Sequence, residues 1–161
     1  MKEPDNIIRI LKETRKAIKE DNSLEMKNLS NQTIHTSIIS QEGDSIVIAV
    51  LVYSLSKVME RDHYRKMEGW GEFYSALMKN LDFAIDYLEK GDVKNFRLSI
   101  GRIRNSLNEI SGDLMTYIKD VFRKSEINKA FKLYEHGLSL EQTADLLGVN
   151  LWDLSSYVGQ S

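Results

Sequence analysis

Polar side chains that could carry acid–base chemistry gather around two residues one helical turn apart, Asn31 and His35. The same stretch also holds Gln32, Thr33 and Thr36, followed by Glu42 and Asp44. Catalysis needs a nucleophile, a base and an orienting group within mutual reach, and no spacing here specifies such a set. Capping and hydrogen bonds within a helical bundle would explain these residues equally well. We therefore expect no enzyme and rank a small-molecule or catalytic site around Asn31 and His35 third among the functional hypotheses.

Metal and cofactor chemistry has little support in the sequence. The chain has no Cys, which excludes disulfides and thiolate ligands, and its three His lack the paired spacing of a metal site. Gly69 and Gly71 flank Trp70 without the Lys and Ser or Thr that a phosphate-binding loop requires. The sequence thus predicts no metal and no cofactor.

Basic side chains follow one side of the helix expected over residues 93–110. They are Lys94, Arg97 and Arg104, with Arg102 nearby. Such a stripe can contact phosphates, whereas a solvated helix face beside an apolar seam produces the same pattern more often. Both interpretations stay open.

Residues 126–161 carry the most specific local pattern of the chain. Ser139 and Gln142 have the spacing of a capping box, and Gly148 stands where a helix would end in a residue with positive φ. Asn150 can then cap the next helix. One apolar residue per turn supplies a small core: Ala130, Leu133, Leu138, Ala144, Leu147, Val149, Leu154 and Val158. The pattern predicts three short helices in series.

This segment resembles the trihelical helix-turn-helix module of prokaryotic regulators and recombinases. It also resembles the short C-terminal module of small antitoxin-like proteins, whose third helix likewise carries a Trp followed by an acidic residue, here Trp152 and Asp153. The resemblance implies a surface for DNA made of Gln142, Asn150, Leu151, Trp152, Ser155 and Ser156. Supporting basic contacts would come from Lys124, Lys129 and Lys132 on the preceding helix.

The charge distribution of the segment favours a protein ligand over DNA. The chain has 22 basic and 24 acidic residues, so it offers no overall positive field, and no Lys or Arg occurs between Gly137 and Ser161. That span instead holds Glu141, Asp145 and Asp153. Two hypotheses follow: a DNA-binding transcription regulator that acts as a dimer, and an adaptor whose module docks a protein through Trp152 and Tyr157.

The elements that must position these residues are predicted to be helices throughout, because the single Pro is at position 4 and Gly is rare inside periodic segments. We expect an all-α multi-helix bundle with helices over residues 4–21, 24–41, 45–62, 72–90 and 93–110, and Asp44 as the N-cap of the third. A β-strand over residues 46–52 is the alternative for the most apolar run.

We expect two parts, a helical body over residues 1–124 and a helix-turn-helix-like module over residues 125–161 packed on the body. Within the body, Ser111, Gly112 and Asp113 should break the pattern before a further helical stretch that approaches the module, and residues 126–136 should form the first helix of the module. Apolar seams over residues 74–88 and 93–110 predict an antiparallel hairpin. These seams favour a homodimer, although packing within the chain would satisfy them too.

The expected compartment is the cytoplasm. The most apolar run, residues 46–55, is far shorter than the roughly 20 residues that a membrane-spanning helix requires. The start of the chain is charged and leads into an amphipathic stretch, unlike a signal peptide. We therefore expect no membrane association.

Overall fold

The chain is all-helical wherever the computed structural model describes it, namely residues 1, 3–40, 43–105 and 112–160. The elements are α1 (Pro4–Lys19), α2 (Ser23–Ser40), α3 (Gly43–Met59), the 3₁₀ helix η1 (Asp62–Lys66), α4 (Trp70–Glu89), α5 (Val93–Asn105), α6 (Asp113–Glu135), α7 (Leu140–Leu147) and α8 (Leu151–Gln160). The all-α prediction is confirmed. The strand alternative for residues 46–52 is wrong, because α3 buries side chains around its whole axis and can satisfy its backbone internally.

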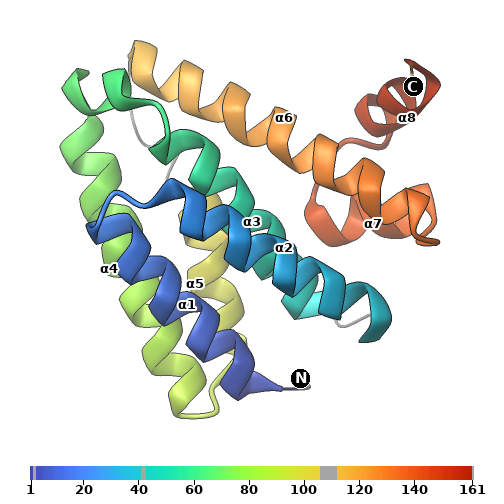
Figure 1. Cartoon of the computed structure of the whole chain (residues 1–161), viewed down its shortest axis with the longest axis horizontal. Helices are drawn as coiled ribbons and strands as arrows, with labels where there is room; N and C mark the ends of the chain where they lie inside the picture. The colour runs from blue at the N-terminus through green and yellow to red at the C-terminus, as the bar shows by residue number, and fades with distance from the viewer. Residues whose placement is uncertain (2, 41–42, 106–111, 161) are drawn as a thin grey trace.

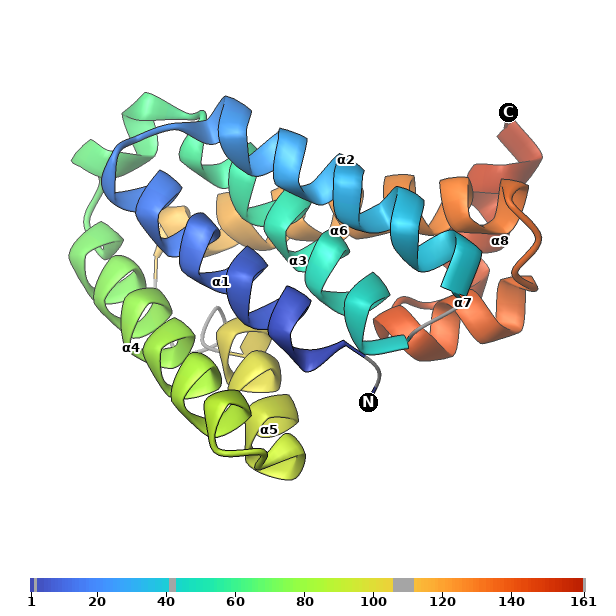
Figure 2. The ribbon, with the colours of Figure 1, turned by 60° about the horizontal axis from the view of Figure 1, so that its bottom comes forward.

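Helix α3 lies at the centre of the bundle, with α2 on one side and α6 on the other (Figure 1). Helices α4 and α5 form the predicted antiparallel hairpin, and α1 packs against α2 and α4 (Figure 2). Helices α7 and α8 follow the end of α6 and lie at the opposite end of the molecule from α4 (Figure 1). None of the described helices combines the length and the apolar character needed to cross a bilayer.

One large apolar cluster fills the body. It takes Leu55 from α3, Phe73 and Leu77 from α4, and Phe96 from α5, all at most 1% exposed. The seam over residues 74–88 therefore faces the interior, and so does the part of the second seam that the structure describes. Packing within the chain satisfies both seams, so they give no support to a homodimer. Leu107 and Ile110, at the end of the second seam, lie outside the described residues.

The turn between α4 and α5 confirms two predicted signals. Gly91 has φ 76°, a left-handed conformation that ends α4, and Asp92 accepts a hydrogen bond from the Asn95 backbone N–H at 3.1 Å. Asp44, by contrast, is not a cap. It lies in the first turn of α3, and its carboxylate binds Arg97 across the bundle.

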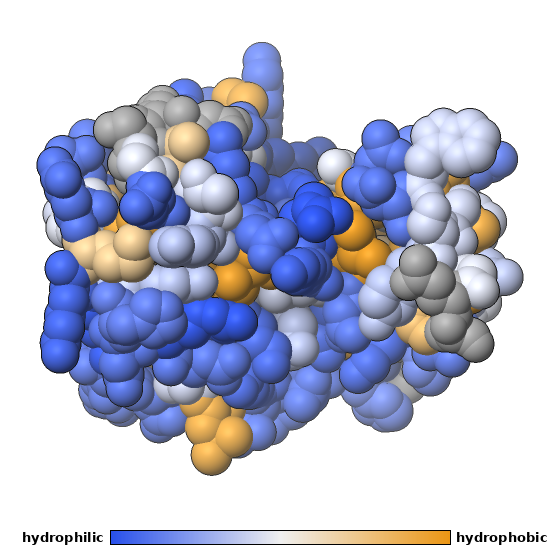
Figure 3. Space-filling view, turned by 90° about the horizontal axis from the view of Figure 1, so that it is seen from above, coloured by the Kyte–Doolittle hydropathy of each residue, from blue (hydrophilic) through white to orange (hydrophobic). Residues whose placement is uncertain are grey.

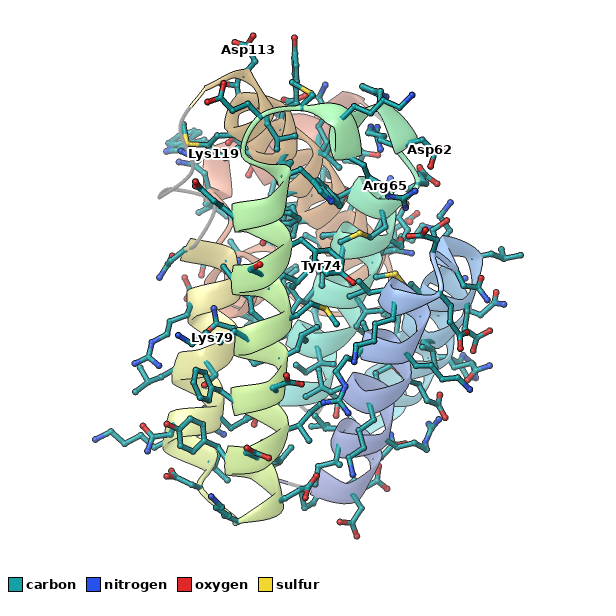
Figure 4. The ribbon with its side chains drawn as sticks, turned by 90° about the vertical axis from the view of Figure 1, so that its left-hand side faces the viewer. Asp62, Arg65, Tyr74, Lys79, Asp113 and Lys119 are labelled. Atoms are coloured by element: carbon teal, nitrogen blue, oxygen red, sulfur yellow. The ribbon has the colours of Figure 1, made fainter. Side chains whose placement is uncertain are left out.

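The third predicted helix ends earlier than expected, at Met59, and the 3₁₀ helix η1 follows it. Arg65 of η1 donates to the Met59 carbonyl at 2.9 Å and pairs with Asp62 at 2.9 Å. Figure 4 shows Arg65 and Asp62 together at this end of the molecule. The side chain thus binds a carbonyl that the end of α3 leaves without a helical partner.

Helix α6 runs without interruption over 23 residues, from Asp113 to Glu135. The predicted boundary between residues 124 and 125 falls inside it, because no Gly or Pro stands in this stretch to end a helix. A second, smaller apolar cluster joins the end of α6 to α7 and α8 and includes Ile46 and Val50 of α3. The body and the C-terminal segment therefore share both a helix and a core.

Candidate partner-binding face of the C-terminal module

The start and orientation of α7 and α8 are fixed by the caps that the sequence predicted. The Gln142 backbone N–H donates to Ser139 Oγ at 3.0 Å, and the Ser139 N–H donates to Gln142 Oε1 at 3.2 Å. Gly148 has φ 66° and ends α7, while Asn150 Oδ1 accepts from the Trp152 N–H at 2.8 Å. Gln142 Oε1 and Asn150 Oδ1 thus serve the helix ends, which limits what these two side chains can offer a ligand.

The inner face of α8 is packed. Leu154 is fully buried in the small cluster, and Tyr157 lies with its ring 5.3 Å from that of Phe131 in an edge-on arrangement. The Tyr157 hydroxyl accepts a hydrogen bond from Asn128 Nδ2 at 3.1 Å. Tyr157 was predicted as a docking anchor, but these contacts use it to hold α8 against α6.

The outer face of α8 exposes an aromatic side chain. Trp152 is 80% exposed and its neighbour Leu151 is 39% exposed. Asp153 and Ser156 are exposed on the same helix, whereas Ser155 is half-buried. The face that remains accessible is therefore an apolar pair with an acidic neighbour.

A surface hollow of about 250 Å³ lies beside the contact between α6 and α8. It is lined by Arg123, Lys124, Ile127, Asp153, Ser156 and Tyr157. In Figure 3, apolar surface is visible between the C-terminal module on the right and the polar side chains of the body. The hollow thus pairs basic side chains of α6 with an acidic side chain of α8.

The three supporting lysines have different surroundings. Lys129 is only 4% exposed, and its Nζ lies 4.0 Å from the centroid of the Tyr53 ring. Burial, together with the charges of Lys132 and Lys57, lowers the pKa of Lys129 to about 8. Lys124 is exposed and pairs with Asp120 at 2.8 Å. Lys129 is therefore not available to a DNA phosphate, which corrects the prediction, while Lys124 and Lys132 remain at the surface.

The basic stripe on α5 is not a free surface. Arg97 donates from Nε and Nη2 to the two carboxylate oxygens of Asp44, at 2.9 and 2.7 Å. Arg104 donates to Glu126 of α6 and to the Leu147 carbonyl at the end of α7. Arg97 and Arg104 are therefore already paired with carboxylates. Of the three residues, Lys94 alone is both exposed and without a carboxylate partner in the described part of the chain, as the phosphate-contact interpretation requires.

Arg104 joins three helices, and sequence reasoning missed this role. Its partners lie 22 and 43 residues further along the chain, and no local spacing signals such distant pairs. Burial raises the pKa of Glu126, and the Arg104 guanidinium opposes that shift. The contact holds the C-terminal end of α7 against α5 and α6.

Asn31 and His35 are both exposed, and Asp44 is bound to Arg97. A cavity of about 570 Å³ beside them is lined by Glu3, Asp5, Asn6, Arg9, Gln32 and Thr33, and includes neither residue. Glu42 and the Thr36 side chain lie outside the described part of the chain. Among the residues that the structure describes, no three His, Asp or Glu side chains are grouped to hold a metal ion.

Comparison with protein-family models, with curated proteins and with solved structures finds no match. The resemblance of residues 125–161 to a helix-turn-helix module stays a prediction.

Proposed function

We propose that the protein is a non-enzymatic adaptor whose C-terminal module docks a partner protein through the outer face of α8. The observation that carries the proposal is the 80% exposure of Trp152 on a helix whose neighbouring Leu154 is fully buried. Burial of Leu154 fixes the helix, so Trp152 is held outward in a defined position and is absent from the core.

A fixed, exposed indole suits protein recognition. Trp is enriched among the few residues that dominate binding energy, because it buries a large area and loses little conformational entropy. Leu151, 39% exposed, extends the apolar centre next to it. Together they resemble the centre of a small interface surrounded by polar residues.

The charges on α7 and α8 favour a basic partner surface. Glu141, Asp145 and Asp153 are exposed, and residues 137–161 contain no Lys or Arg. A phosphate backbone would be repelled, whereas Lys or Arg around a pocket for the indole would be attracted. The partner we propose is a protein with an apolar pocket bordered by basic side chains.

The second candidate function is DNA binding by a dimeric regulator. The hollow between α6 and α8 favours it, because Arg123 and Lys124 line one side and could contact phosphates. Lys132 is exposed further along α6. The ion pairs of Arg123 and Lys124 with Asp120 weaken this support.

Binding measurements with two variants separate the candidates. Proteins retained by the wild-type chain would be purified and then titrated against the wild type and Trp152→Ala. Leu98→Ala, which removes an apolar side chain that is 48% exposed on α5, is the matched control. We expect Trp152→Ala to weaken binding by about 30-fold or more, as for an anchor worth about 2 kcal/mol, and the control to bind normally.

A duplex DNA titration at low and moderate salt forms the other arm. The DNA-binding regulator would be favoured over the adaptor by DNA binding that weakens steeply as salt is raised. That binding should be lost in the double variant Lys124→Glu with Lys132→Glu and retained in Trp152→Ala. Equal partner binding by wild type and Trp152→Ala would contradict the docking role of Trp152.

Trp152→Ala should leave the fold intact. Because the side chain is exposed, its removal is expected to change the free energy of unfolding by less than about 0.5 kcal/mol. Urea unfolding followed by circular dichroism measures this change. A loss of several kcal/mol would place Trp152 in the core and remove it from the interface.

Self-association is a separate proposal. The seams that suggested a homodimer pack inside the chain, so a dimer would have to use another surface. Sedimentation velocity over a range of concentrations tests whether the chain associates with itself.

A further inference from the structure

A second hollow, of about 270 Å³, lies on the other side of Lys124 between α3 and α6. We call it the α3–α6 groove; it is lined by Tyr53, Lys57, Arg61, Asp120, Val121, Lys124, Ser125 and Asn128. Tyr53 and Lys57 lie one turn apart on α3, and Arg61 follows just after the end of α3 at Met59. None of these three residues belongs to the proposed docking face.

Positive charge exceeds negative charge around this groove. Two carboxylates, Glu60 and Asp120, are shared by five cations: Lys27, Lys57, Arg61, Arg123 and Lys124. The pKa of Glu60 is lowered: burial acts against this, but the Lys27 hydrogen bond and the charges of Lys57 and Arg61 outweigh it. The five cations therefore carry more positive charge than the two carboxylates balance, and a further anion could bind to them.

Lys129 is a buried cation next to the groove, although it is not one of the residues that line it. It follows Ser125 by one helical turn, and its Nζ lies against the ring of Tyr53, which lines the groove. At 4% exposure it has no carboxylate partner among the described residues. A buried cation without a counter-ion is costly, and the face of one aromatic ring compensates only part of that cost. An anion in the groove would supply the missing charge.

We propose that the α3–α6 groove binds a small molecule carrying a phosphate group. Lys57, Arg61 and Lys124 would contact the phosphate oxygens, while Lys129 stabilises the negative charge from behind Tyr53. Ser125 and Asn128 line the groove and can orient the rest of the molecule. A dianion fits this surplus of cations better than a single carboxylate does. Asp120 also lines the groove and would repel the additional charges of an extended polyanion.

Titration of the isotope-labelled full chain with inorganic phosphate at constant ionic strength tests the proposal by NMR. We expect saturable shifts of the backbone amides of Tyr53, Lys57, Ser125 and Asn128. Acetate, a monocarboxylate, should bind at least about tenfold more weakly. Glycerol phosphate, a phosphate monoester, distinguishes two kinds of site. A site for phosphate esters should bind it more tightly than inorganic phosphate, whereas a site for free phosphate should not.

Variants assign the binding to the groove. Lys57→Gln and Lys129→Met should each weaken phosphate binding by about fivefold or more, because each removes one cation near the anion. Lys79→Gln removes the same charge from the exposed face of α4, where Figure 4 shows the side chain, and should bind phosphate as the wild type does. Circular dichroism verifies that each variant is folded.

Three outcomes would overturn the proposal. The first is the absence of saturable shifts with phosphate and with glycerol phosphate. The second is equal weakening in Lys79→Gln and Lys57→Gln, which would mean diffuse attraction to the whole surface. The third is a short duplex DNA that shifts the same amides at much lower concentration than glycerol phosphate, which would make the groove part of a nucleic-acid surface.

Discussion

Lys129 shows how far residue type alone can mislead. The resemblance of the C-terminal segment to a DNA-binding module made each lysine on the preceding helix a candidate phosphate contact. Whether a helical lysine faces solvent depends on which neighbour covers it, and here Tyr53, which lies 76 residues earlier in the chain, does so. Burial that arises from a distant residue leaves no trace in local spacing.

Lys129→Met should make stability less dependent on pH. The pKa of Lys129 is about 8 in the folded chain, against 10.5 ordinarily, so between these values the unfolded chain binds the extra proton. The cost of burying the charge is fully present below pH 8 and disappears as the pH rises toward 10.5. The wild type should therefore gain up to about 3 kcal/mol relative to Lys129→Met across this window, since one pKa unit corresponds to about 1.4 kcal/mol.

Urea unfolding of both chains between about pH 7 and about pH 10 measures this difference. Lys79→Met, at an exposed position on α4, controls for the general titration of lysines and tyrosines and should show a constant difference from the wild type. A constant difference for Lys129→Met as well would mean that Lys129 is not desolvated.

At the scale of elements, the sequence was most informative where a signal acts within a few residues. The capping box of Ser139 and Gln142, the left-handed Gly148 and the Asn150 cap are all present as predicted. Element boundaries that depend on tertiary packing were less accurate. Helix α6 continues because no Gly or Pro interrupts it, and α3 ends at Met59, whose carbonyl accepts a hydrogen bond from Arg65 of η1.

Gly148→Ala should destabilise the C-terminal module by about 1 to 2 kcal/mol. The left-handed conformation at φ 66° is strained for any residue with a Cβ, and that Cβ would lie 3.2 Å from Arg104 Nη2. The substitution would also disturb the hydrogen bond of Arg104 to the Leu147 carbonyl. Thermal and urea unfolding measure the loss.

A double-mutant cycle with Arg104→Met tests whether the two residues act together. Because Arg104 contacts the backbone at the end of α7, the combined loss should be smaller than the sum of the single losses. Gly91→Ala, at a left-handed glycine with nothing near its Cβ, is the control and should add independently to Arg104→Met. Additive losses in both cycles would mean that the guanidinium does not support the turn.

At the scale of the whole molecule, the fold class could be predicted from the sequence, whereas the packing that joins the two predicted parts could not. The second apolar cluster combines Ala144 and Leu154 of the module with Ile46 and Val50 of α3. These residues lie about a hundred positions apart, as the printed sequence shows, and nothing near either pair indicates that they meet. The candidate interface was also only partly predicted, since Trp152 was expected on it but the internal use of Tyr157 was not.

We expect the full chain to unfold in a single transition. Helix α6 and the second cluster make the body and the module depend on each other, so neither can lose its structure without exposing apolar surface of the other. Calorimetry should give equal van't Hoff and calorimetric enthalpies. Two separate transitions, or early loss of amide protection confined to α7 and α8, would contradict this expectation.

The position of Lys124 on α6 has a consequence for regulation. This residue lines both the α3–α6 groove and the hollow beside α8, so an anion in the groove and a ligand in the hollow would compete for the orientation of one side chain. Thermodynamic linkage requires that whatever factor the anion applies to the affinity of the hollow for its ligand, that ligand applies equally to the affinity of the groove for the anion. If the hollow contacts DNA, as in the second candidate function, a phosphorylated metabolite in the groove would act as a concentration-dependent control on DNA binding.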